Sequence, residues 1–567
     1  MNTITTSKAR CRDCYKCIRH CPVKAIGLND GQAWVDQEKC ILCGQCVGAC
    51  PQKAKSMPSQ LPLFENFLAG SDGVVISLAP SYLAAGPFLT PWKLLAGLKR
   101  SGRLRIEETA VAAERIAAEY HRLSGADRPE TVISGCCPVV VNLIEKYFPQ
   151  LVPSLAGVIS PMLAHGRMIK ADQGPSAKVV FIGPCLAKKA EPDWDSPENS
   201  VDAVLTFDEV AAWLDARGPD PDSLDDEYPD ACSPHAGIFP LKHGIIRTAG
   251  LAEGLNREIL SVTGIDDCLE TFRDLERGLI RPRFVEALAC KGGCIGGPAI
   301  GNSLGINVRR DRLLRFANTR PAGPDRAPLP AAELQKRHQP RPRSGPVPTE
   351  AEIREILSRT GKHRPEDETN CGGCGYPSCR EKAVAVFQGM AEPEMCVPYM
   401  KEKAESFSNT IVDTTLNAIV VVDQDLIIQE FNPAAEWMFN RKNVPSKGRP
   451  LSAFIDPADF KTVWETQTAL IDQVRSYSQY GLVTRQVVYP LPRYGVIIGI
   501  FTDITAEENR KLRHDAMRRE ALDKASMVIR EQMRVVQNIA GLLGESTAET
   551  KATLLELIAI MNESEAP

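Results

Sequence analysis

The chain has 567 residues, a net charge of −4, 43% hydrophobic residues and 24% charged residues. This length exceeds what one hydrophobic core can hold, the composition is that of a globular protein, and the small net charge favours neither nucleic acid nor a membrane surface as a partner. No apolar run approaches the roughly 18 residues of a spanning helix, and the polar first 16 residues lack the apolar core of a signal peptide. The 19 cysteines, an odd number clustered at two-residue spacings, predict metal clusters in a reducing cytoplasm rather than disulfides.

The first 62 residues contain a duplicated cysteine pattern. The run C-x2-C-x2-C-x3-C-P occupies residues 11–22 and recurs at residues 40–51. Four thiolates at this spacing wrap a 4Fe–4S cubane, whereas zinc sites rarely show such a duplicated run. The module resembles bacterial two-cluster ferredoxins, in which the fourth cysteine of each run ligates the other cluster. The resemblance implies one cluster on Cys11, Cys14, Cys17 and Cys50, and a second on Cys40, Cys43, Cys46 and Cys21.

Residues 70–315 show the pattern of an α/β domain. Three apolar, strand-like runs each lead into a loop of small residues: 74–78 into Ala79, Pro80 and Ser81, 131–134 into 135–138, and 178–182 into 183–185. A helical pattern follows the second run over 139–148, and a shorter one follows the third from Leu186. Strand, loop and helix in this order predict an α/β sheet, and such sheets bind ligands at the carboxyl ends of their strands.

A fourth segment, residues 284–297, places two cysteines among paired glycines after an apolar run. Glycines let the backbone approach a bulky inorganic group, so Cys290 and Cys294 are candidate metal ligands. We expect them to meet the cysteines of the strand-end loops in one pocket.

Three segments, 134–138, 183–191 and 284–297, resemble in order the three active-site motifs of FeFe-hydrogenases. The resemblance implies an H-cluster, a cubane bridged by one cysteine to a diiron unit with CO, cyanide and a dithiolate amine. It implies that the cubane is held by Cys137, Cys185, Cys290 and Cys294, with Cys294 as the bridge.

The same resemblance assigns roles around the diiron unit. It implies that Cys136 passes protons to the bridging amine, that Lys188 pairs with a cyanide, and that Ala79, Pro80 and Ser81 lie against the cyanides. We expect only one of the adjacent Cys136 and Cys137 to ligate a cluster. The alternatives are a small buried hydrophobic residue at Cys136 and a solvated helix lysine at Lys188.

Several positions depart from the family pattern. Gly183 and Leu288 stand where the family has methionines, and a gap-free count from Cys136 puts Ile116, Glu119 and Ala156 where the family's proton path has two glutamates and a serine. Proton transfer needs an unbroken set of groups within hydrogen-bond reach. Glu119 is therefore either a remaining catalytic residue or a solvated helix residue, and we predict a site that binds H2 or turns it over slowly.

Residues 318–350 are rich in proline and arginine and are predicted to be a linker. In residues 351–407 a glycine-rich run brings four further cysteines: Cys371, Cys374, Cys379 and Cys396. Their spacing suits either a cubane or zinc. The run resembles the small 4Fe–4S domain of electron-transfer subunits and corrinoid iron–sulfur proteins, which implies a cluster.

Residues 408–506 are predicted to contain strands at 418–423, 426–431, 482–489 and 495–501, and a short helix at 432–439. This arrangement resembles a PAS sensor domain, which either binds a ligand or serves as a dimer scaffold. Residues 507–543 are predicted to be helical, as a coiled coil between two copies or as a single amphipathic helix. Thr547 is a candidate cap for a last helix through Met561.

The predicted fold class is multidomain α/β and α+β: a ferredoxin-like module, an α/β H-cluster domain, a small 4Fe–4S domain and a PAS domain with C-terminal helices. This order resembles the sensory class of FeFe-hydrogenases. It implies an H2-responsive homodimer that exchanges electrons with a redox partner such as ferredoxin and signals to a kinase, phosphatase or transcription regulator. The alternatives are a catalytic ferredoxin-linked hydrogenase, and an electron-transfer or assembly protein without the diiron unit.

Overall fold

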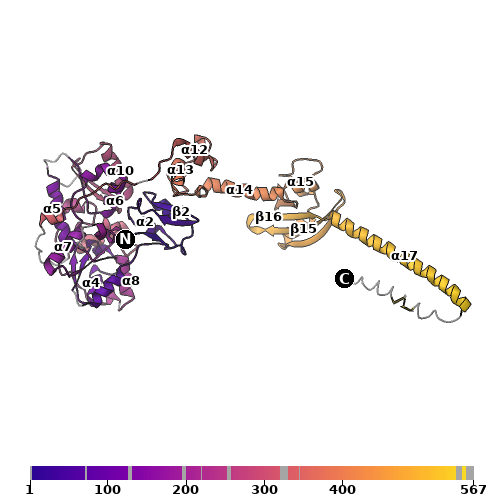
Figure 1. The fold of residues 1–567 in the computed structure, drawn as a ribbon, viewed down its shortest axis with the longest axis horizontal. Helices are drawn as coiled ribbons and strands as arrows, with labels where there is room; N and C mark the ends of the chain where they lie inside the picture. Colours follow the sequence, from indigo (N-terminus) through magenta and orange to yellow (C-terminus); the bar gives the residue numbers. More distant parts are fainter. Residues whose placement is uncertain are drawn as a thin grey trace. The chain divides into compact units, whose positions relative to one another are not determined.

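The computed structural model describes residues 3–70, 73–125, 130–194, 200–218, 220–251, 257–319, 330–343, 345–543, 552–553 and 555–556. They form two compact units, Met1–Met400 and Lys401–Pro567 (Figure 1). Across these ranges no helix combines the length and the apolar character needed to cross a bilayer. The predicted terminal helix, Thr547 to Met561, lies outside the described residues except at 552, 553, 555 and 556.

The ferredoxin-like module folds as two similar halves. Helices α1 (Lys16–His20) and α2 (Gln45–Ala49) each begin inside a cysteine run, after a residue with left-handed backbone: Tyr15 at φ 55° and Gly44 at φ 76°. Two antiparallel pairs complete the module, β1 (Thr5–Thr6) with β4 (Lys55–Ser56) and β2 (Ile26–Asn29) with β3 (Gln32–Val35). The duplicated sequence therefore gives a duplicated turn and helix.

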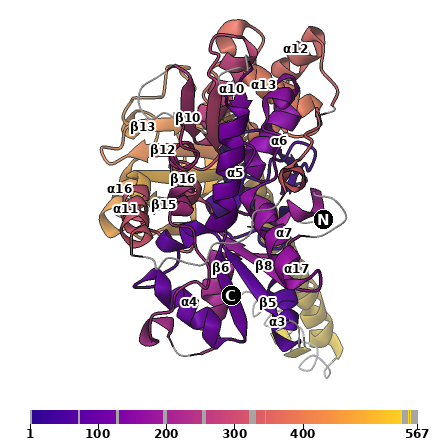
Figure 2. The same ribbon diagram turned by 90° about the vertical axis from the view of Figure 1, so that its left-hand side faces the viewer.

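The next domain contains two parallel sheets rather than the single sheet predicted. One has the order β6 (Leu104–Glu108), β5 (Val74–Leu78), β8 (Lys178–Gly183), β9 (Ala203–Thr206), and Figure 2 shows β5, β6 and β8 side by side. The other has the order β10 (Ile259–Thr263), β11 (Phe284–Leu288), β7 (Val132–Ile133). The predicted run at 131–134 is thus a strand, but it pairs with β11 some 150 residues later, a partner that local pattern cannot indicate.

Helices cover both sheets. Helix α7 (Pro161–Gln173) packs on β5 and β8, α5 (Ala110–Leu123) packs on α7, and α10 (Ile265–Glu276) packs on β10 and β11. Every residue of β5 and of β11 is buried, as expected for parallel strands covered on both faces. The remaining helices of this domain are α3 (Leu61–Ala69), α4 (Pro91–Arg100), α6 (Pro138–Tyr147), α8 (Phe207–Asp215), α9 (Gly244–Thr248) and α11 (Ile306–Ala317).

Residues 330–343 of the predicted linker lie on the α/β domain. Leu334 is buried, and its carbonyl accepts a hydrogen bond of 2.8 Å from the Ile159 backbone N–H. Glu145 of α6 receives two partners from this segment, Arg341 Nε at 2.8 Å and His338 Nδ1 at 3.2 Å. These contacts come from the neighbouring domain, so composition alone could not reveal them.

Glu145→Gln is expected to loosen this segment. Burial raises the pKa of Glu145, but the hydrogen bond with His338 and the Arg341 charge together hold its pKa below the usual 4.5. The stabilisation is therefore present above the usual glutamate pKa and is lost as pH falls through the lowered one. Loss of the charge-assisted bonds should cost about 1–3 kcal/mol. Trypsin should cut faster at Lys336 and Arg337 in this variant, whereas Glu355→Gln, in the exposed pair with Arg359, should not change the rate. Equal cleavage of both variants would contradict the docking.

The first unit ends in the small cysteine-rich domain. Helices α12 (Glu350–Ser358) and α13 (Cys379–Phe387) pack together, and α14 (Val397–Thr414) follows the last cysteine. The domain contacts the ferredoxin-like module through the hydrogen bonds Leu28 N–H to Met390 O at 3.2 Å and Lys39 Nζ to Gln388 Oε1 at 3.0 Å.

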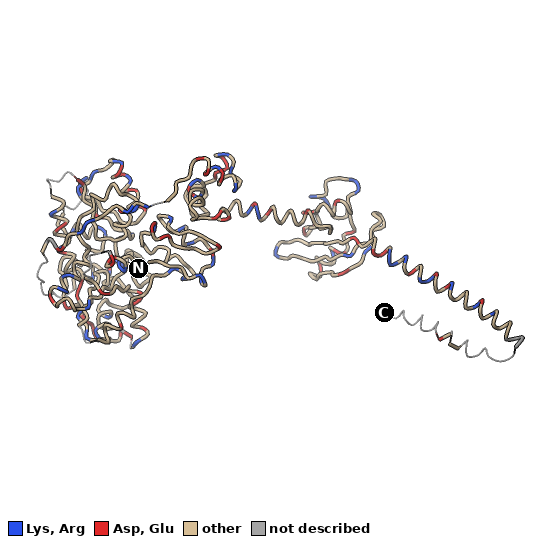
Figure 3. Tube along the Cα trace, viewed as in Figure 1, with Lys and Arg blue, Asp and Glu red and all other residues tan. Residues whose placement is uncertain are grey.

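The second unit contains a five-stranded antiparallel sheet of order β13 (Ile428–Phe431), β12 (Ala418–Asp423), β16 (Val496–Asp503), β15 (Leu482–Leu491), β14 (Leu470–Tyr477). The four predicted strands and the short helix α15 (Pro433–Phe439) are confirmed; β14 and α16 (Ala458–Thr466) were not predicted. The predicted helix at 507–543 is confirmed as α17 (Thr505–Leu543), along which basic and acidic residues are interspersed (Figure 3).

Candidate metal centre

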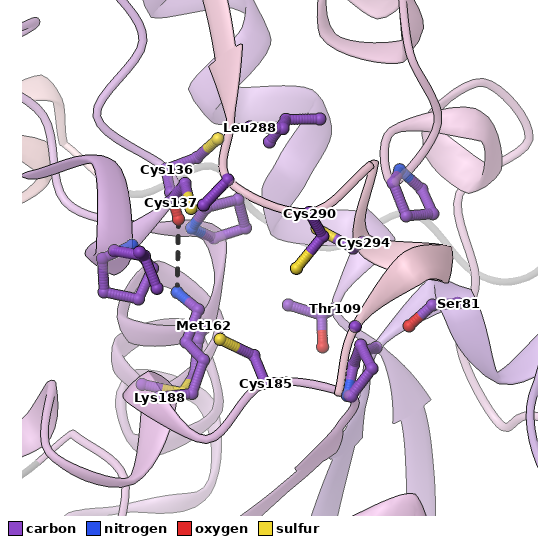
Figure 4. Close-up of a pocket in the computed structure, with 18 of the residues that line it drawn as sticks. Ser81, Thr109, Cys136, Cys137, Met162, Cys185, Lys188, Leu288, Cys290 and Cys294 are labelled. Carbon is purple, nitrogen blue, oxygen red and sulfur yellow. Dashed lines mark hydrogen bonds between the residues drawn. The ribbon is translucent and has the colours of Figure 1, made fainter. Parts of the chain in front are cut away.

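A cavity of about 100 Å³ lies where the carboxyl ends of strands from both sheets meet (Figure 4). It is lined by residues that follow four strands: Ala79, Pro80 and Ser81 after β5, Thr109 after β6, Cys136 and Cys137 after β7, and Cys290 and Cys294 after β11. Cys185 and Lys188, beyond β8, complete this set. The structure therefore brings together the cysteines of three separate sequence segments.

The cavity thiols are poor acids in the protein alone. Burial raises the pKa of Cys185 to about 11 and that of Cys294 to about 12, and it raises the pKa of Cys136 and Cys290 well above the usual value. Such thiols stay protonated until a cation displaces the protons. The cavity holds four soft sulfur donors that suit iron in a cubane: Cys137, Cys185, Cys290 and Cys294.

Two polar side chains face this apolar cavity. Lys188 Nζ lies 2.6 Å from Glu191 Oε2 and 3.4 Å from the Cys136 carbonyl oxygen (Figure 4). Burial lowers the pKa of Lys188, but Glu191 and the nearby sulfurs more than offset this and raise its pKa, so the ammonium stays charged. Ser81 Oγ is buried and has no hydrogen-bond partner within the described ranges. An ammonium and a free hydroxyl suit a cofactor with anionic ligands.

Gly183 and Leu288, the two positions where the family has methionines, have different surroundings. A side chain at Gly183 would place its Cβ 2.6 Å from the ring of Phe181, and Phe181 itself lines the cavity. Leu288 and Met162 add further apolar lining. The phenylalanine ring thus lies in the space that a larger residue at position 183 would need.

The predicted proton-path residues do not reach the cavity as a set. Ile116 and Ala156 are buried and carry no exchangeable side-chain proton. Glu119 Oε2 instead receives Arg122 Nη2 at 2.8 Å, on the outer side of α5, and Glu119 is not among the described residues that line the cavity. The structure therefore leaves Cys136 in the cavity wall and places the candidate Glu119 elsewhere.

The structure places the ferredoxin-like cysteines in two groups. Cys11, Cys14, Cys17 and Cys50 line one cavity, and Cys21 lies close enough to Cys40, Cys43 and Cys46 to interact with them electrostatically. Cys43 also lines the large cavity. The next residue is Gly44, where a Cβ would lie 2.7 Å from Leu186 Cδ1. This close approach places the second set next to the large cavity.

A third cysteine site lies against the set that contains Cys14. Cys371, Cys374, Cys379 and Cys396 line one small cavity. Arg19 connects this site to the ferredoxin-like module, donating to the Cys14 carbonyl at 2.9 Å and to the Gly373 carbonyl at 3.4 Å. Arg19 therefore joins the third site to the ferredoxin-like module beside Cys14.

Lys362→Met is expected to lower the reduction potential of a cluster in the third site. Lys362 is buried and its Nζ lies 3.4 Å from Cys396 Sγ, so its charge stabilises the more negative, reduced state. A charge-assisted bond is worth about 1.5–3 kcal/mol, which corresponds to about 60–130 mV for one electron. A redox titration followed by electron paramagnetic resonance checks this. Exposed Lys401→Met should leave the potential unchanged, and an equal potential in both variants would contradict the role of Lys362.

The sequence did not indicate four residues of these sites: Thr109, Met162, Phe181 and Lys362. Thr109 follows a strand end and obeys the rule applied to the other loops, but the charged sequence of β6 hid that strand. Lys362 precedes the first cysteine of its site by nine residues, and no spacing rule indicates it.

Three segments of the chain match known protein families, and these segments carry the cysteine sites described above. Residues 3–56 match the family described as a 4Fe-4S dicluster domain, and residues 367–398 match a putative Fe-S cluster family. The chain is thus an iron–sulfur redox protein. Residues 72–298 match the family described as the C-terminal domain of the iron-only hydrogenase large subunit.

Similar proteins include hydrogenases and an assembly factor. The chain is 26% identical over 370 residues to Iron hydrogenase 1 of Clostridium pasteurianum, which covers 52% of this chain and 64% of that protein. It is 28% identical over 342 residues to the NADP-reducing hydrogenase subunit HndD of Solidesulfovibrio fructosivorans, covering 51% and 55%. It is 24% identical over 216 residues to the cytosolic Fe-S cluster assembly factor NAR1 of Encephalitozoon cuniculi, covering 34% and 58%. The chain spans less than two thirds of the length of each of these relatives.

Proposed function

We propose that this protein binds or slowly oxidises H2 at an H-cluster and passes the resulting redox state to a regulatory partner. The observation that carries the proposal is the shared cavity, in which four thiols, the Lys188 ammonium and the unpartnered Ser81 hydroxyl surround one apolar space next to Cys43. When bound, the diiron unit supplies the chemistry that splits H2.

The chain's own residues have distinct tasks in this proposal. Cys137, Cys185, Cys290 and Cys294, which line the cavity, would hold the cubane, and Cys294 would also hold the diiron unit. Lys188 neutralises an anionic ligand and Ser81 donates a hydrogen bond to another, while Ala79 and Pro80 close the wall beside them. Phe181 and Leu288 exclude water. The apolar Ile116 and Ala156 support slow turnover, because neither can carry a proton.

The cysteine sites would connect this centre to a signalling output. Electrons leave through the set containing Cys43 toward the other ferredoxin-like set and the third site, and a redox partner such as ferredoxin exchanges them. Helix α14 begins directly after the ligand Cys396, whose carbonyl accepts from Met400 N–H at 2.9 Å. We propose that this helix transmits the redox state to a PAS domain in the second unit, and from there to a kinase, phosphatase or transcription regulator in the cytoplasm.

Infrared spectroscopy of the purified, matured protein tests the proposed function. Bands of bound CO and cyanide should be present and should change under H2, while H2 evolution with a reduced viologen should stay far below that of a catalytic hydrogenase. Absent bands would remove H2 from the function.

Two other functions have specific support. Similarity to hydrogenases favours a catalytic, ferredoxin-linked enzyme, which fast turnover would reveal. Similarity to NAR1 favours an assembly or electron-transfer protein without the diiron unit, for which the infrared bands would be missing.

A homodimer through the helices is part of the proposal. Phe407 and Ile411 of α14 are 68% and 54% exposed, and with Ala404 and Thr414 they recur at coiled-coil spacings of three and four. Changing both Phe407 and Ile411 to Asp should convert a dimer into a monomer in light scattering after size-exclusion chromatography. Glu405→Ala on the same helix is the control. An unchanged mass in the double variant would exclude α14 from the interface.

A further inference from the structure

A row of hydrogen-bonded side chains leads away from the large cavity. Thr109 lines the cavity, and its Oγ1 lies 2.8 Å from Ser77 Oγ. Ser77 Oγ lies 2.8 Å from His165 Nδ1, and His165 Nε2 lies 3.3 Å from Glu107 Oε2. Ser77 lies in β5, Glu107 in β6, Thr109 directly after β6 and His165 in α7, so the packing of α7 on the sheet brings them together.

All four side chains of the row are buried, and the last of them pairs with an exposed arginine. Ser77, His165 and Glu107 are 0% exposed and Thr109 is 4% exposed. Glu107 Oε1 pairs with Arg105 Nε at 2.6 Å, and the Arg105 side chain is 44% exposed. The row therefore begins at the cavity wall and ends beside a side chain at the protein surface.

Each member of the row can accept a proton, and the two hydroxyls and the imidazole can also donate one. Hydroxyl groups do so by rotation, a neutral imidazole accepts at one nitrogen and donates at the other, and a carboxylate accepts. The links of 2.8–3.3 Å are at or near the reach that proton transfer requires. Burying four polar groups in an otherwise apolar sheet core is costly unless they are paired. Pairing alone, however, does not require the row to reach the cavity.

We propose that Thr109, Ser77, His165 and Glu107 are a proton relay that carries a proton from the cavity to the Glu107 carboxylate, in place of the path interrupted at Ile116 and Ala156. The proposal rests on the proposed function at the same cavity. A proton leaving the cavity binds the Thr109 oxygen as the Thr109 proton passes to Ser77, and the Ser77 proton passes to His165 Nδ1. The Nε2 proton of His165 then passes to the Glu107 carboxylate. Only O–H and N–H bonds form and break, and no electrons move along the row.

Thr109→Val tests the relay, because it removes the hydroxyl and keeps the side-chain shape. In the matured protein, H2/D2O isotope exchange should fall by about 100-fold, the scale of a lost acid–base group, while the infrared band positions and the melting temperature stay close to those of the unsubstituted protein. Thr109→Ser should rescue the exchange. Tyr82→Phe removes a neighbouring buried hydroxyl, 2.8 Å from Glu108 Oε1 and outside the row, and should not slow it.

Ser77→Ala provides a second interruption should Thr109→Val fail to fold, and it should also slow the exchange. If both interruptions show normal infrared bands and exchange at the unsubstituted rate, the relay is wrong and the proposed function stands. If Tyr82→Phe slows exchange as much as Thr109→Val, the row has only a structural role. If the unsubstituted matured protein has no CO and cyanide bands, the proposed function and the relay fall together.

Discussion

Cys294→Ser is expected to abolish the infrared bands of CO and cyanide and all response to H2. Cys294 lines the cavity with three other cysteines, and it is the proposed bridge between the cubane and the diiron unit. A serine oxygen is a harder ligand than a thiolate and does not match iron–sulfur clusters well. The diiron unit should therefore fail to bind, even where the cubane forms on the three remaining cysteines.

Cys268→Ser is the matched control for this experiment. Cys268 is also buried, with its Sγ 3.8 Å from the Leu288 carbonyl, but it is not among the described residues that line the cavity. This variant should keep its bands and its response to H2. Bands of normal position and intensity in Cys294→Ser would show that another residue bridges the two parts of the cofactor.

Lys188→Met is expected to destabilise the protein by about 3–5 kcal/mol, the usual cost of removing one partner of a buried ion pair. The side chains of Lys188 and Glu191 are 11% and 3% exposed, so the variant leaves the Glu191 carboxylate buried without its cation. Denaturant unfolding of the protein before maturation measures this cost. The double variant Lys188→Met with Glu191→Gln should recover most of it, because it removes both charges.

The double variant also separates structure from ligand binding. If Lys188 neutralises an anionic ligand, the stable double variant should still load the diiron unit poorly and give weak or displaced cyanide bands. If stability and bands return together, Lys188 serves only to pair with Glu191. Arginine at position 188 is not an equivalent replacement, because its planar fork would have to fit the small space beside Cys136 O.

Much of the local structure follows from the sequence. The duplicated cysteine runs indicate two clusters with exchanged fourth ligands, and the structure groups Cys50 with the first run. The apolar runs at 74–78 and 178–182 are strands, because β-branched residues buried on both faces leave little choice. In the second unit, strands β12, β13, β15 and β16 and helix α15 were also predicted from the sequence, whereas β14 and α16 were not.

The sequence by itself determined which residue types could hold iron and sulfur, because cluster ligation depends on soft thiolates at short, local spacings. Tertiary packing decides which other side chains lie beside these cysteines. It left Ser81 Oγ at the cavity without a hydrogen-bond partner among the described residues, and it aligned Thr109, Ser77, His165 and Glu107. These relations join residues up to 88 positions apart, and they depend on how helices pack on sheets rather than on local pattern.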